Sequence, residues 1–384
     1  MLPSYLPNSF ISRERRAETG ATSYGSRSVC YWIVFGVICV LVGGSLENSD
    51  REGYAQNYHD MRDGFNLDFE PGYQISAWVF SNLGASYELF TFAVAITALT
   101  LIASTVRVFT DRPTAVLMMY AAYPMFWDYV QVRNFMAMAV LIYAARYVIS
   151  PVKRLNHFLL FVLLAATFHV TSLFYLVCAL MAIRRTRNFI IVSIFAFVVY
   201  AYALTIFVGL PWTGIILHKV ESYAFTETSL TTKAAIIVFY LASLVLIYAT
   251  HLIIRDSQIQ VRFVADQASE TSIQLHVTRV GVGLSRVMQI DSAAVLRLFW
   301  LMGFCLPLVL INLDFMRLFR NVFVVSAICF VIALYSLRSA LLATTYGLAI
   351  LIYLAACFTG LVFYVTTTPI VGQILSSNVV VALF

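Results

Sequence analysis

The run AAIIVFYLASLVLIYATHLII, residues 234–254, decides the fold of this chain. It contains no Asp, Glu, Lys or Arg. At about 1.5 Å per residue in a helix, a run of this length crosses the roughly 30 Å hydrocarbon core of a bilayer. Its apolar residues are continuous and do not alternate with polar ones, which favours a helix over a strand of a membrane barrel. The run therefore predicts a membrane-spanning helix.

The composition extends this prediction to the whole chain. Of 384 residues, 61% are hydrophobic and 11% are charged, against about 45–50% and about 25% in soluble domains. A soluble fold could not bury so much apolar surface, and an aromatic content of 15% excludes a disordered chain. We expect an all-α polytopic integral membrane protein.

The apolar runs predict about 10–12 transmembrane helices. They form one membrane domain, residues 29–384, after a cytoplasmic N-terminal segment, residues 1–28. The spans are expected at about residues 29–45, 86–106, 113–128, 129–149, 155–168, 170–183, 189–209, 232–254, 297–312, 318–336 and 341–365.

The basic residues predict the orientation of these spans. With the N-terminus in the cytoplasm, most of the 25 Lys and Arg residues fall in cytoplasmic segments, as the positive-inside rule requires. The net charge of +6 therefore reflects orientation and does not indicate nucleic-acid binding. Residues 46–72 then form an extracytoplasmic loop, and the other extracytoplasmic loops are expected to be short. Residues 255–296 become a cytoplasmic loop, which is either an amphipathic stretch on the membrane surface or an ordinary connection.

The sequence gives no sign of a metal site or a cofactor. The six cysteines lie within apolar runs, without a CxxC pair or a Cys/His cluster. The Walker, Rossmann, HExxH and GxSxG patterns are all absent. We expect neither a disulfide framework nor a bound metal.

The polar groups near membrane depth are the candidates for function, because each costs roughly 2.5–3.5 kcal/mol on insertion scales. The segment WDYVQVRNFMAMAV, residues 127–140, contains Asp128, Gln131, Arg133 and Asn134. Asp128 followed three residues later by Gln131 resembles a capping box, which predicts a helix from about Tyr129 with its N-terminus outside. That N-terminus and the guanidinium of Arg133 would bind a phosphate or diphosphate. The alternative is an interfacial arginine paired with Asp128.

Two further candidates lie on the same side of the predicted membrane. His169 separates two short apolar segments, which places it at a turn where it can act as acid, base or hydrogen-bond donor. A histidine bonded to a backbone carbonyl is the alternative. Arg317 and Arg320 are three residues apart and are predicted to project from one helical face. A solvated face at the membrane interface is the alternative for this pair.

The first extracytoplasmic loop combines acidic and aromatic side chains. Carboxylates accept hydrogen bonds from sugar hydroxyls, and aromatic rings stack on the apolar faces of sugars. This pattern predicts sugar binding, although a plain hydrophilic loop has the same composition. The candidate residues are Tyr54, Tyr58, Asp60, Asp63 and Glu70.

These clusters, in this order, resemble the EpsG-type Wzy family of bacterial polysaccharide polymerases. The resemblance spans roughly residues 30–330. It rests on Tyr54 and Tyr58 followed by FEPGYQ (69–74), on VRNFMAMAV (132–140), on LAATFHVTSL (164–173) and on MRLFRNVF (316–323).

The resemblance implies a glycosyltransferase of the bacterial inner membrane that polymerises O-antigen, capsule or exopolysaccharide. Such an enzyme transfers a growing glycan from its polyprenyl-diphosphate carrier to a new lipid-linked oligosaccharide repeat at the extracytoplasmic face. It implies catalytic roles for His169, Arg133, Arg317 and Arg320, of which the arginines would stabilise the leaving diphosphate without a metal. The implied partners are the lipid-linked repeat, membrane lipids, and a flippase and chain-length regulator of the same pathway.

Two alternatives remain open from the sequence. One is another transferase of lipid-linked sugars, such as an O-antigen ligase. The other is a polysaccharide flippase or secondary transporter, which would place charged groups near the middle of its helices. In this chain the charged groups gather at one face, which favours an enzyme at the membrane interface.

Overall fold

The computed structural model describes residues 29–46, 50–61, 69–128, 130–208, 230–271, 288–311, 313–365 and 377–378. Within these ranges the regular elements are helices, and the described residues also form an isolated bridge between Ser45 and Asn378. After an apolar helix at Val29–Gly43, the elements are α2 (Arg51–Asp60), α3 (Pro71–Asn82), α4 (Tyr87–Phe109), α5 (Pro113–Ala122), α6 (Met125–Asp128), α7 (Val132–Ile149), α8 (Leu155–Ala166), the 3₁₀ helix η1 (Val170–Ala182), α9 (Thr186–Val208), α11 (Leu230–Thr271), α12 (Ser292–Leu301), η3 (Met302–Cys305), α13 (Leu306–Ile311), η4 (Leu313–Phe315), α14 (Met316–Arg320), α15 (Phe323–Ser336) and α16 (Ala340–Val365).

The described helices confirm an all-α polytopic membrane protein. Seven of them are long and apolar enough to cross a membrane, and four shorter apolar helices accompany these. Each of these helices overlaps one of the expected spans. The short ones include α5, which starts with Pro113 at its first position, and α8 with η1, which together form two apolar arms around a turn.

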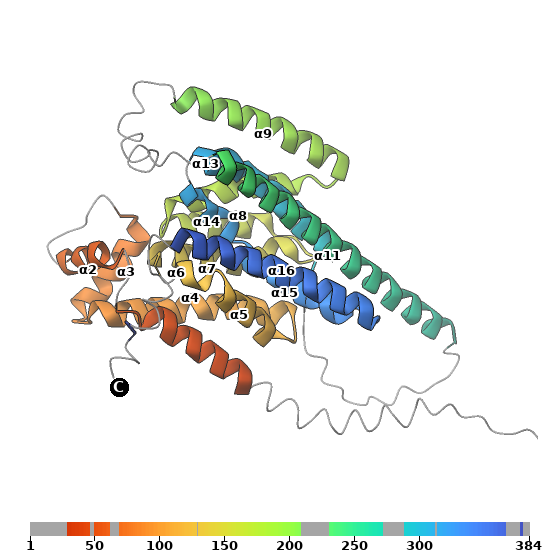
Figure 1. Ribbon diagram of the computed structural model, residues 1–384, viewed down its shortest axis with the longest axis horizontal. Helices are drawn as coiled ribbons and strands as arrows, with labels where there is room; N and C mark the ends of the chain where they lie inside the picture. The colour runs from red at the N-terminus through yellow and green to blue at the C-terminus, as the bar shows by residue number, and fades with distance from the viewer. Residues whose placement is uncertain are drawn as a thin grey trace, which may run out of the picture.

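The core of the bundle is built on α4, α7 and α15. The residues of α7 and α15 are mostly buried, whereas α9, α11 and α16 expose most of theirs, as suits helices that face lipid. Figure 1 shows α9 set apart from the other helices at the top of the view. Small residues of α7, including Ala137 and Ala144, are fully buried and allow close packing between helices.

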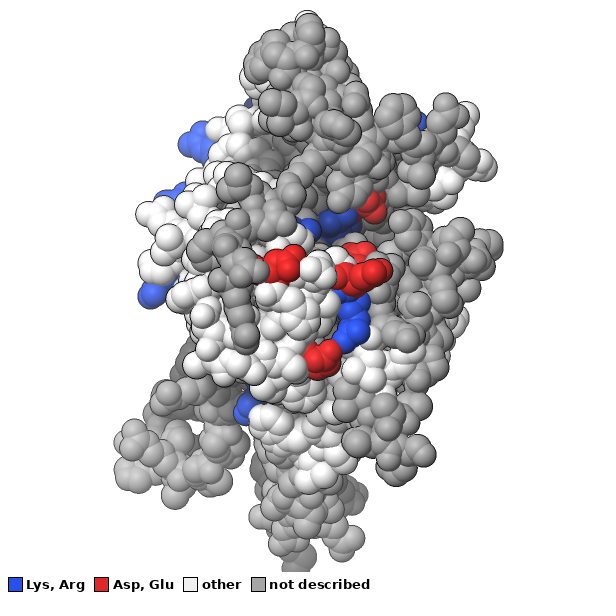
Figure 2. All heavy atoms as spheres, turned by 90° about the vertical axis from the view of Figure 1, so that its left-hand side faces the viewer, with Lys and Arg blue, Asp and Glu red and all other residues white. Residues whose placement is uncertain are grey.

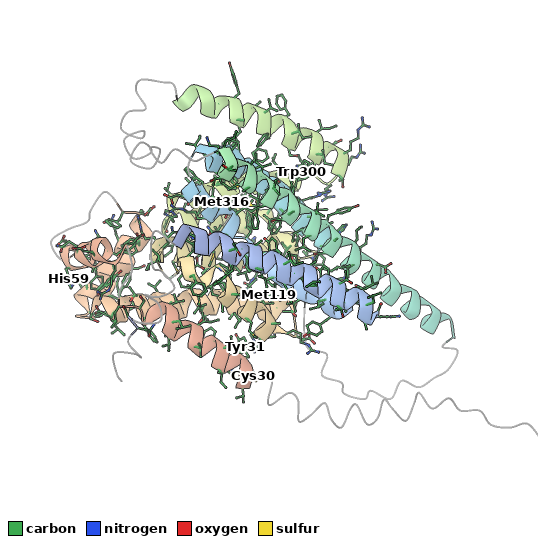
Figure 3. The ribbon with its side chains drawn as sticks, viewed as in Figure 1. Cys30, Tyr31, His59, Met119, Trp300 and Met316 are labelled. Atoms are coloured by element: carbon green, nitrogen blue, oxygen red, sulfur yellow. The ribbon has the colours of Figure 1, made fainter. Side chains whose placement is uncertain are left out.

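The two ends of the bundle collect different segments. At one end, called the loop-1 end here, lie α2, α3 and the start of α7 (Figure 1, left). In Figure 3, His59 of α2 lies at this end, and Cys30 marks the start of the first helix, away from it. At the opposite end, the backbone N–H of Met288 donates to Val108 O (2.7 Å) and that of Asp291 donates to Ile149 O (2.6 Å).

Segments expected on the same side of the membrane therefore lie at the same end of the bundle. Arg297 reinforces the second end, because it donates to the carbonyl oxygens of Ile183 and Arg184 at 2.8 and 2.9 Å. Lys153 also pairs with Asp291 there, at 3.2 Å. Which end faces the cytoplasm stays a prediction from the charge distribution.

Both long loops contain helical residues that the sequence does not predict. The first loop forms α2, and α3 follows it before the first long span. Pro71 occupies the first turn of α3, where its missing N–H costs nothing. The expected cytoplasmic loop 255–296 begins as a continuation of α11, which ends at Thr271. Most of the rest of this loop, where an amphipathic stretch or an ordinary connection is expected, lies outside the described residues, which resume at residue 288.

Candidate functional site

Five side chains from separate segments form a continuous chain of contacts at the loop-1 end. We call this chain the Glu70 network; its members are Tyr54, Glu70, Arg133, His169 and Arg317. Arg133 Nη1 donates to Glu70 Oε2 at 2.5 Å, and Arg133 Nε donates to Tyr54 Oη at 3.1 Å. Glu70 Oε1 lies 3.1 Å from His169 Nδ1. Arg317 Nη1 lies 3.1 Å from His169 Nε2. The network thus joins three of the residues expected to be catalytic to two expected to bind sugar.

The position of Glu70 follows from the proline after it. A residue before proline avoids the helical region, and Glu70 has φ −69° and ψ 145°. Glu70 is the N-cap of α3, but its side chain does not cap its own helix. Its carboxylate instead accepts from Arg133, from His169 and from the backbone N–H of Val170, at 3.1 Å for the last.

A close backbone contact brings α3 to the turn that carries His169. The N–H of Gly72 donates to Thr167 O at 2.7 Å. A Cβ atom at position 72 would lie 2.3 Å from Thr167 Oγ1, so only glycine fits there without movement. Gly72 therefore sets how closely Glu70 approaches His169.

Arg133 is the second residue of α7 and lies among aromatic rings. Its guanidinium carbon is 4.7 Å from the ring centroid of Phe69 and 5.3 Å from that of Tyr54, both within cation–π range. Burial raises the pKa of the Glu70 carboxyl, but the hydrogen bond from His169 and the charge of Arg133 outweigh it and bring that pKa to about 2. Glu70 is therefore ionised at neutral pH.

The partners of His169 determine its tautomer. An arginine only donates hydrogen bonds, so Nε2 of His169 must accept from Arg317 and carry no proton. Nδ1 then carries the proton and donates it to Glu70. Burial lowers the pKa of His169, the hydrogen bond to Glu70 raises it, and the charges of Arg317 and Arg133 lower it, with a lowered pKa as the result. The imidazole is neutral, with its one lone pair directed at Arg317.

Arg317 is held at its other edge by the preceding turn. Its Nε donates to the backbone oxygen of Asp314 at 2.7 Å, and its Nη2 lies 3.6 Å from Asp314 Oδ2. The η4 turn, Leu313–Phe315, leads directly into α14. Tyr175 of η1 donates to Leu318 O at 2.5 Å and fixes α14 against η1.

Arg320 lies in a buried cluster, and its partners differ from those of Arg317, while its expected catalytic role stays a prediction. It is 6% exposed, donates to Gln131 Oε1 at 2.7 Å, and has its Nε 3.8 Å from Asp128 Oδ1. Asp128 is fully buried and accepts from the hydroxyl of Tyr120 at 3.0 Å. Arg320 therefore joins α14 to α6 and α7.

The expected capping box is wrong. The helix that carries Arg133 begins at Val132 with Gln131 as its N-cap, and Gln131 makes no capping hydrogen bond. Asp128 is the last residue of the short helix α6. The carboxylate of Asp128 pairs with Arg320 and does not cap a helix.

The other expected sugar-binding residues differ in their accessibility. Tyr58 is buried and donates to Ala85 O at 2.9 Å, so it supports the fold of the first loop. Asp60 is exposed and accepts from Gln56. Asn134 is buried and exchanges hydrogen bonds of 3.2 Å with Asn321. Asp63 lies outside the described residues.

The face of the molecule at the loop-1 end carries a group of charged side chains. Figure 2 looks onto this end and shows acidic and basic side chains gathered near the middle of the face, among uncharged residues. A second pair, Arg51 with Glu88, lies at the same end. No group of three or more His, Cys, Asp or Glu among the described residues could hold a metal ion.

The comparison with known families finds one match that covers most of the chain. The model of the EpsG family matches residues 28–368. Neither the search of curated proteins nor the search of solved structures finds a match.

Proposed function

The chain belongs to the EpsG family of Wzy-type, polymerase-like proteins, and we propose that it polymerises surface polysaccharide. Its substrates are oligosaccharide repeats linked to a polyprenyl diphosphate at the extracytoplasmic face of a bacterial inner membrane. The growing glycan leaves its carrier and joins the sugar of a new lipid-linked repeat.

The observation that carries this proposal is the position of His169 between a carboxylate and an arginine. Glu70 holds Nδ1 of the imidazole, and Arg317 lies at Nε2, the atom that can take a proton. In the transfer, a hydroxyl oxygen of the new repeat forms a bond to the anomeric carbon of the growing chain. The bond from that carbon to the diphosphate breaks, and the hydroxyl proton goes to His169 Nε2.

The leaving group requires cations at the membrane surface. Arg133 and Arg317 lie on either side of the Glu70–His169 pair and supply guanidinium groups that can bind phosphate oxygens in a bidentate manner. The negative charge that grows on the diphosphate in the transition state is stabilised by these groups without rearrangement of solvent. Arg320 acts indirectly, because its side chain is committed to Asp128 and Gln131.

The sugars occupy the exposed side of the first-loop helices. Asp60 and His59 of α2 are exposed there, and the partly exposed ring of Phe69 lies beside Arg133, while Tyr54 is buried. This arrangement suits a ligand with a charged diphosphate at one end and hydroxyl-rich rings at the other. The lipid chain of the carrier would lie against the apolar faces of the bundle.

The first test is genetic. The gene is deleted from its host, and the surface glycan and the lipid-linked glycan are separated on gels. A polymerase mutant retains single repeats on the surface, whereas a flippase mutant has none there. Complementation with Arg317→Ala should leave single repeats. Complementation with Arg51→Ala, which changes an arginine at the same end but outside the Glu70 network, should restore long chains.

The second test uses the purified protein in liposomes with one defined lipid-linked repeat. Formation of products with two or more repeats, with release of the polyprenyl diphosphate, supports the proposal. Transport of the repeat across the bilayer without any new glycosidic bond would instead assign the protein to the flippase class. Transfer to an acceptor other than a lipid-linked repeat would assign it to the ligases.

A further inference from the structure

We propose that Glu70 is the positioning residue of a Glu–His pair, and that Arg317 caps the base His169 until the diphosphate of the donor binds Arg317. This inference rests on the proposed function and adds the order of events at the same site. It gives Glu70 a role other than sugar binding, and it makes the donor the switch that activates the base.

The contacts of Glu70 exclude it as the proton acceptor. Its two oxygens accept from Arg133 Nη1, from His169 Nδ1 and from the N–H of Val170. A carboxylate with three donors is a weak base, since each hydrogen bond stabilises the ionised form. What these contacts do is fix the ring of His169 in one tautomer and in one orientation. The carboxylate also stabilises the imidazolium that forms when Nε2 takes a proton.

The lone pair of His169 is occupied in the free protein. Arg317 Nη1 lies 3.1 Å from Nε2, and a guanidinium cannot give up its proton at physiological pH. A sugar hydroxyl cannot reach that lone pair while Arg317 remains in place. The same contact disfavours protonation of the ring, because a proton on Nε2 would face a donor.

Arg317 has the contacts expected of a movable cap. Its Nε is anchored to Asp314 O at 2.7 Å, which provides a pivot. Its Nη2 is 3.6 Å from the Asp314 carboxylate, beyond hydrogen-bond distance. A diphosphate offers oxygens with more charge than the neutral imidazole, so the guanidinium gains by turning from His169 to the ligand.

The charges around His169 predict that its pKa shifts in opposite directions when Arg317 and Glu70 are each replaced. The groups that face the ring are Glu70 from the start of α3, Arg133 from α7 and Arg317 from α14, with Asp314 behind Arg317. Loss of the Arg317 charge favours the imidazolium and should raise the pKa of His169. Loss of the Glu70 charge disfavours the imidazolium and should lower the pKa. These opposite shifts are expected only if both charges lie beside the ring, and the response to the diphosphate then tests the cap itself.

The experiment measures the ¹⁵N resonances of histidine in the full-length protein in lipid nanodiscs. The chain has six histidines, and His169→Gln identifies the signal of interest. The free protein should show the Nδ1–H tautomer with Nε2 as an acceptor. Titration should give a higher pKa for His169 in Arg317→Gln and a lower one in Glu70→Gln. Arg51→Gln and Glu88→Gln alter the neighbouring ion pair and should leave the pKa of His169 unchanged.

A second experiment adds a ligand to the unmodified protein, so its result does not depend on whether a variant folds. Farnesyl diphosphate, added to the unmodified protein, should move the Nε2 resonance away from its hydrogen-bonded position and raise the pKa of His169. Farnesol, which lacks the diphosphate, should do neither. The proposal is overturned by the other tautomer in the free protein, by shifts of equal sign in the two variants, or by no response to the diphosphate.

The outcome is separable from that of the proposed function. If His169 responds as expected and yet the purified protein joins no lipid-linked repeats, the capped Glu–His pair stands and the polymerase assignment falls. If the repeats are joined and His169 does not respond, the polymerase assignment stands without this mechanism.

Discussion

Replacement of Arg133 by lysine tests whether the guanidinium is needed for its shape or only for its charge. Arg133 uses Nε for Tyr54 Oη and Nη1 for Glu70 Oε2, at 3.1 and 2.5 Å. These donors diverge from one planar group, which leaves the remaining N–H groups to meet the diphosphate. A lysine ammonium is a single point on a flexible stem and cannot hold both partners while it binds a phosphate.

The size of the loss follows from the number of contacts removed. Lysine at this position forfeits at least one hydrogen bond to a charged group, which is worth about 1.5–3 kcal/mol. That range corresponds to a rate of transfer lower by roughly ten- to 150-fold, at about 1.36 kcal/mol per factor of ten. Arg133→Ala removes the charge as well. Arg133→Ala should therefore lower the rate of transfer by at least roughly 10²–10³-fold. Removal of one oxyanion-hole donor lowers the rate of other enzymes by that factor.

The assay is the initial rate of dimer formation from a defined lipid-linked repeat, with purified protein in liposomes. Arg51→Lys is the matched control, because it changes an arginine that pairs with a glutamate at the same end of the bundle. That variant should keep the unaltered rate within about twofold, since partly exposed ion pairs outside the site contribute little. A normal rate and normal chain length in Arg133→Lys would show that Arg133 is only an interfacial anchor.

Three further predictions concern the buried Asp128–Arg320 pair, the orientation in the membrane and the contact at Gly72. Asp128→Leu and Arg320→Leu should each destabilise the fold by about 3–5 kcal/mol, because each leaves a buried charge unpaired, and the double variant should recover much of this loss in thermal unfolding. A cysteine at Gln56 should react with an impermeant thiol reagent in cells with a permeabilised outer membrane, and one at Thr186 should not; the reverse pattern would invert the assigned orientation. Gly72→Ala should slow transfer with little change in donor binding, measured separately, because it pushes α3 away from His169.

The spans of this protein can be predicted from its sequence because burial in lipid leaves a direct mark on composition. A helix in the lipid needs a long, mostly apolar run, and such runs are visible without knowledge of any contact. The helices of the first loop leave a weaker mark. Glu70 followed by Pro71 is a recognisable start for α3, but α2 has a polar sequence that does not differ from a loop.

The contacts of the site could not be predicted, because they join residues that are distant in sequence. Glu70 is 99 residues from His169, and His169 is 148 residues from Arg317. The sequence indicated that these residues lie on the same side of the membrane. It could not show that one carboxylate contacts both Arg133 and His169.

Arg317 and Arg320 illustrate how local spacing can mislead. A spacing of three places both on one face of a long helix, but α14 has only five residues and is wedged between other elements. The two arginines differ in the groups that lie within their reach. Asp128 is fully buried and needs a cation, which Arg320 provides, whereas Arg317 meets a neutral imidazole.

The charge balance of the Glu70 network and the adjacent Asp314 bears on how a donor binds and on when the base is strongest. Arg133 and Arg317 contribute two positive charges, Glu70 and Asp314 contribute two negative ones, and His169 is neutral. The free site therefore has little net charge with which to attract a diphosphate, and binding must proceed by exchange of partners. Once bound, the diphosphate adds negative charge beside an imidazole that has lost its cap. Both changes favour the imidazolium, so arrival of the leaving group makes His169 a stronger base at the step that requires one.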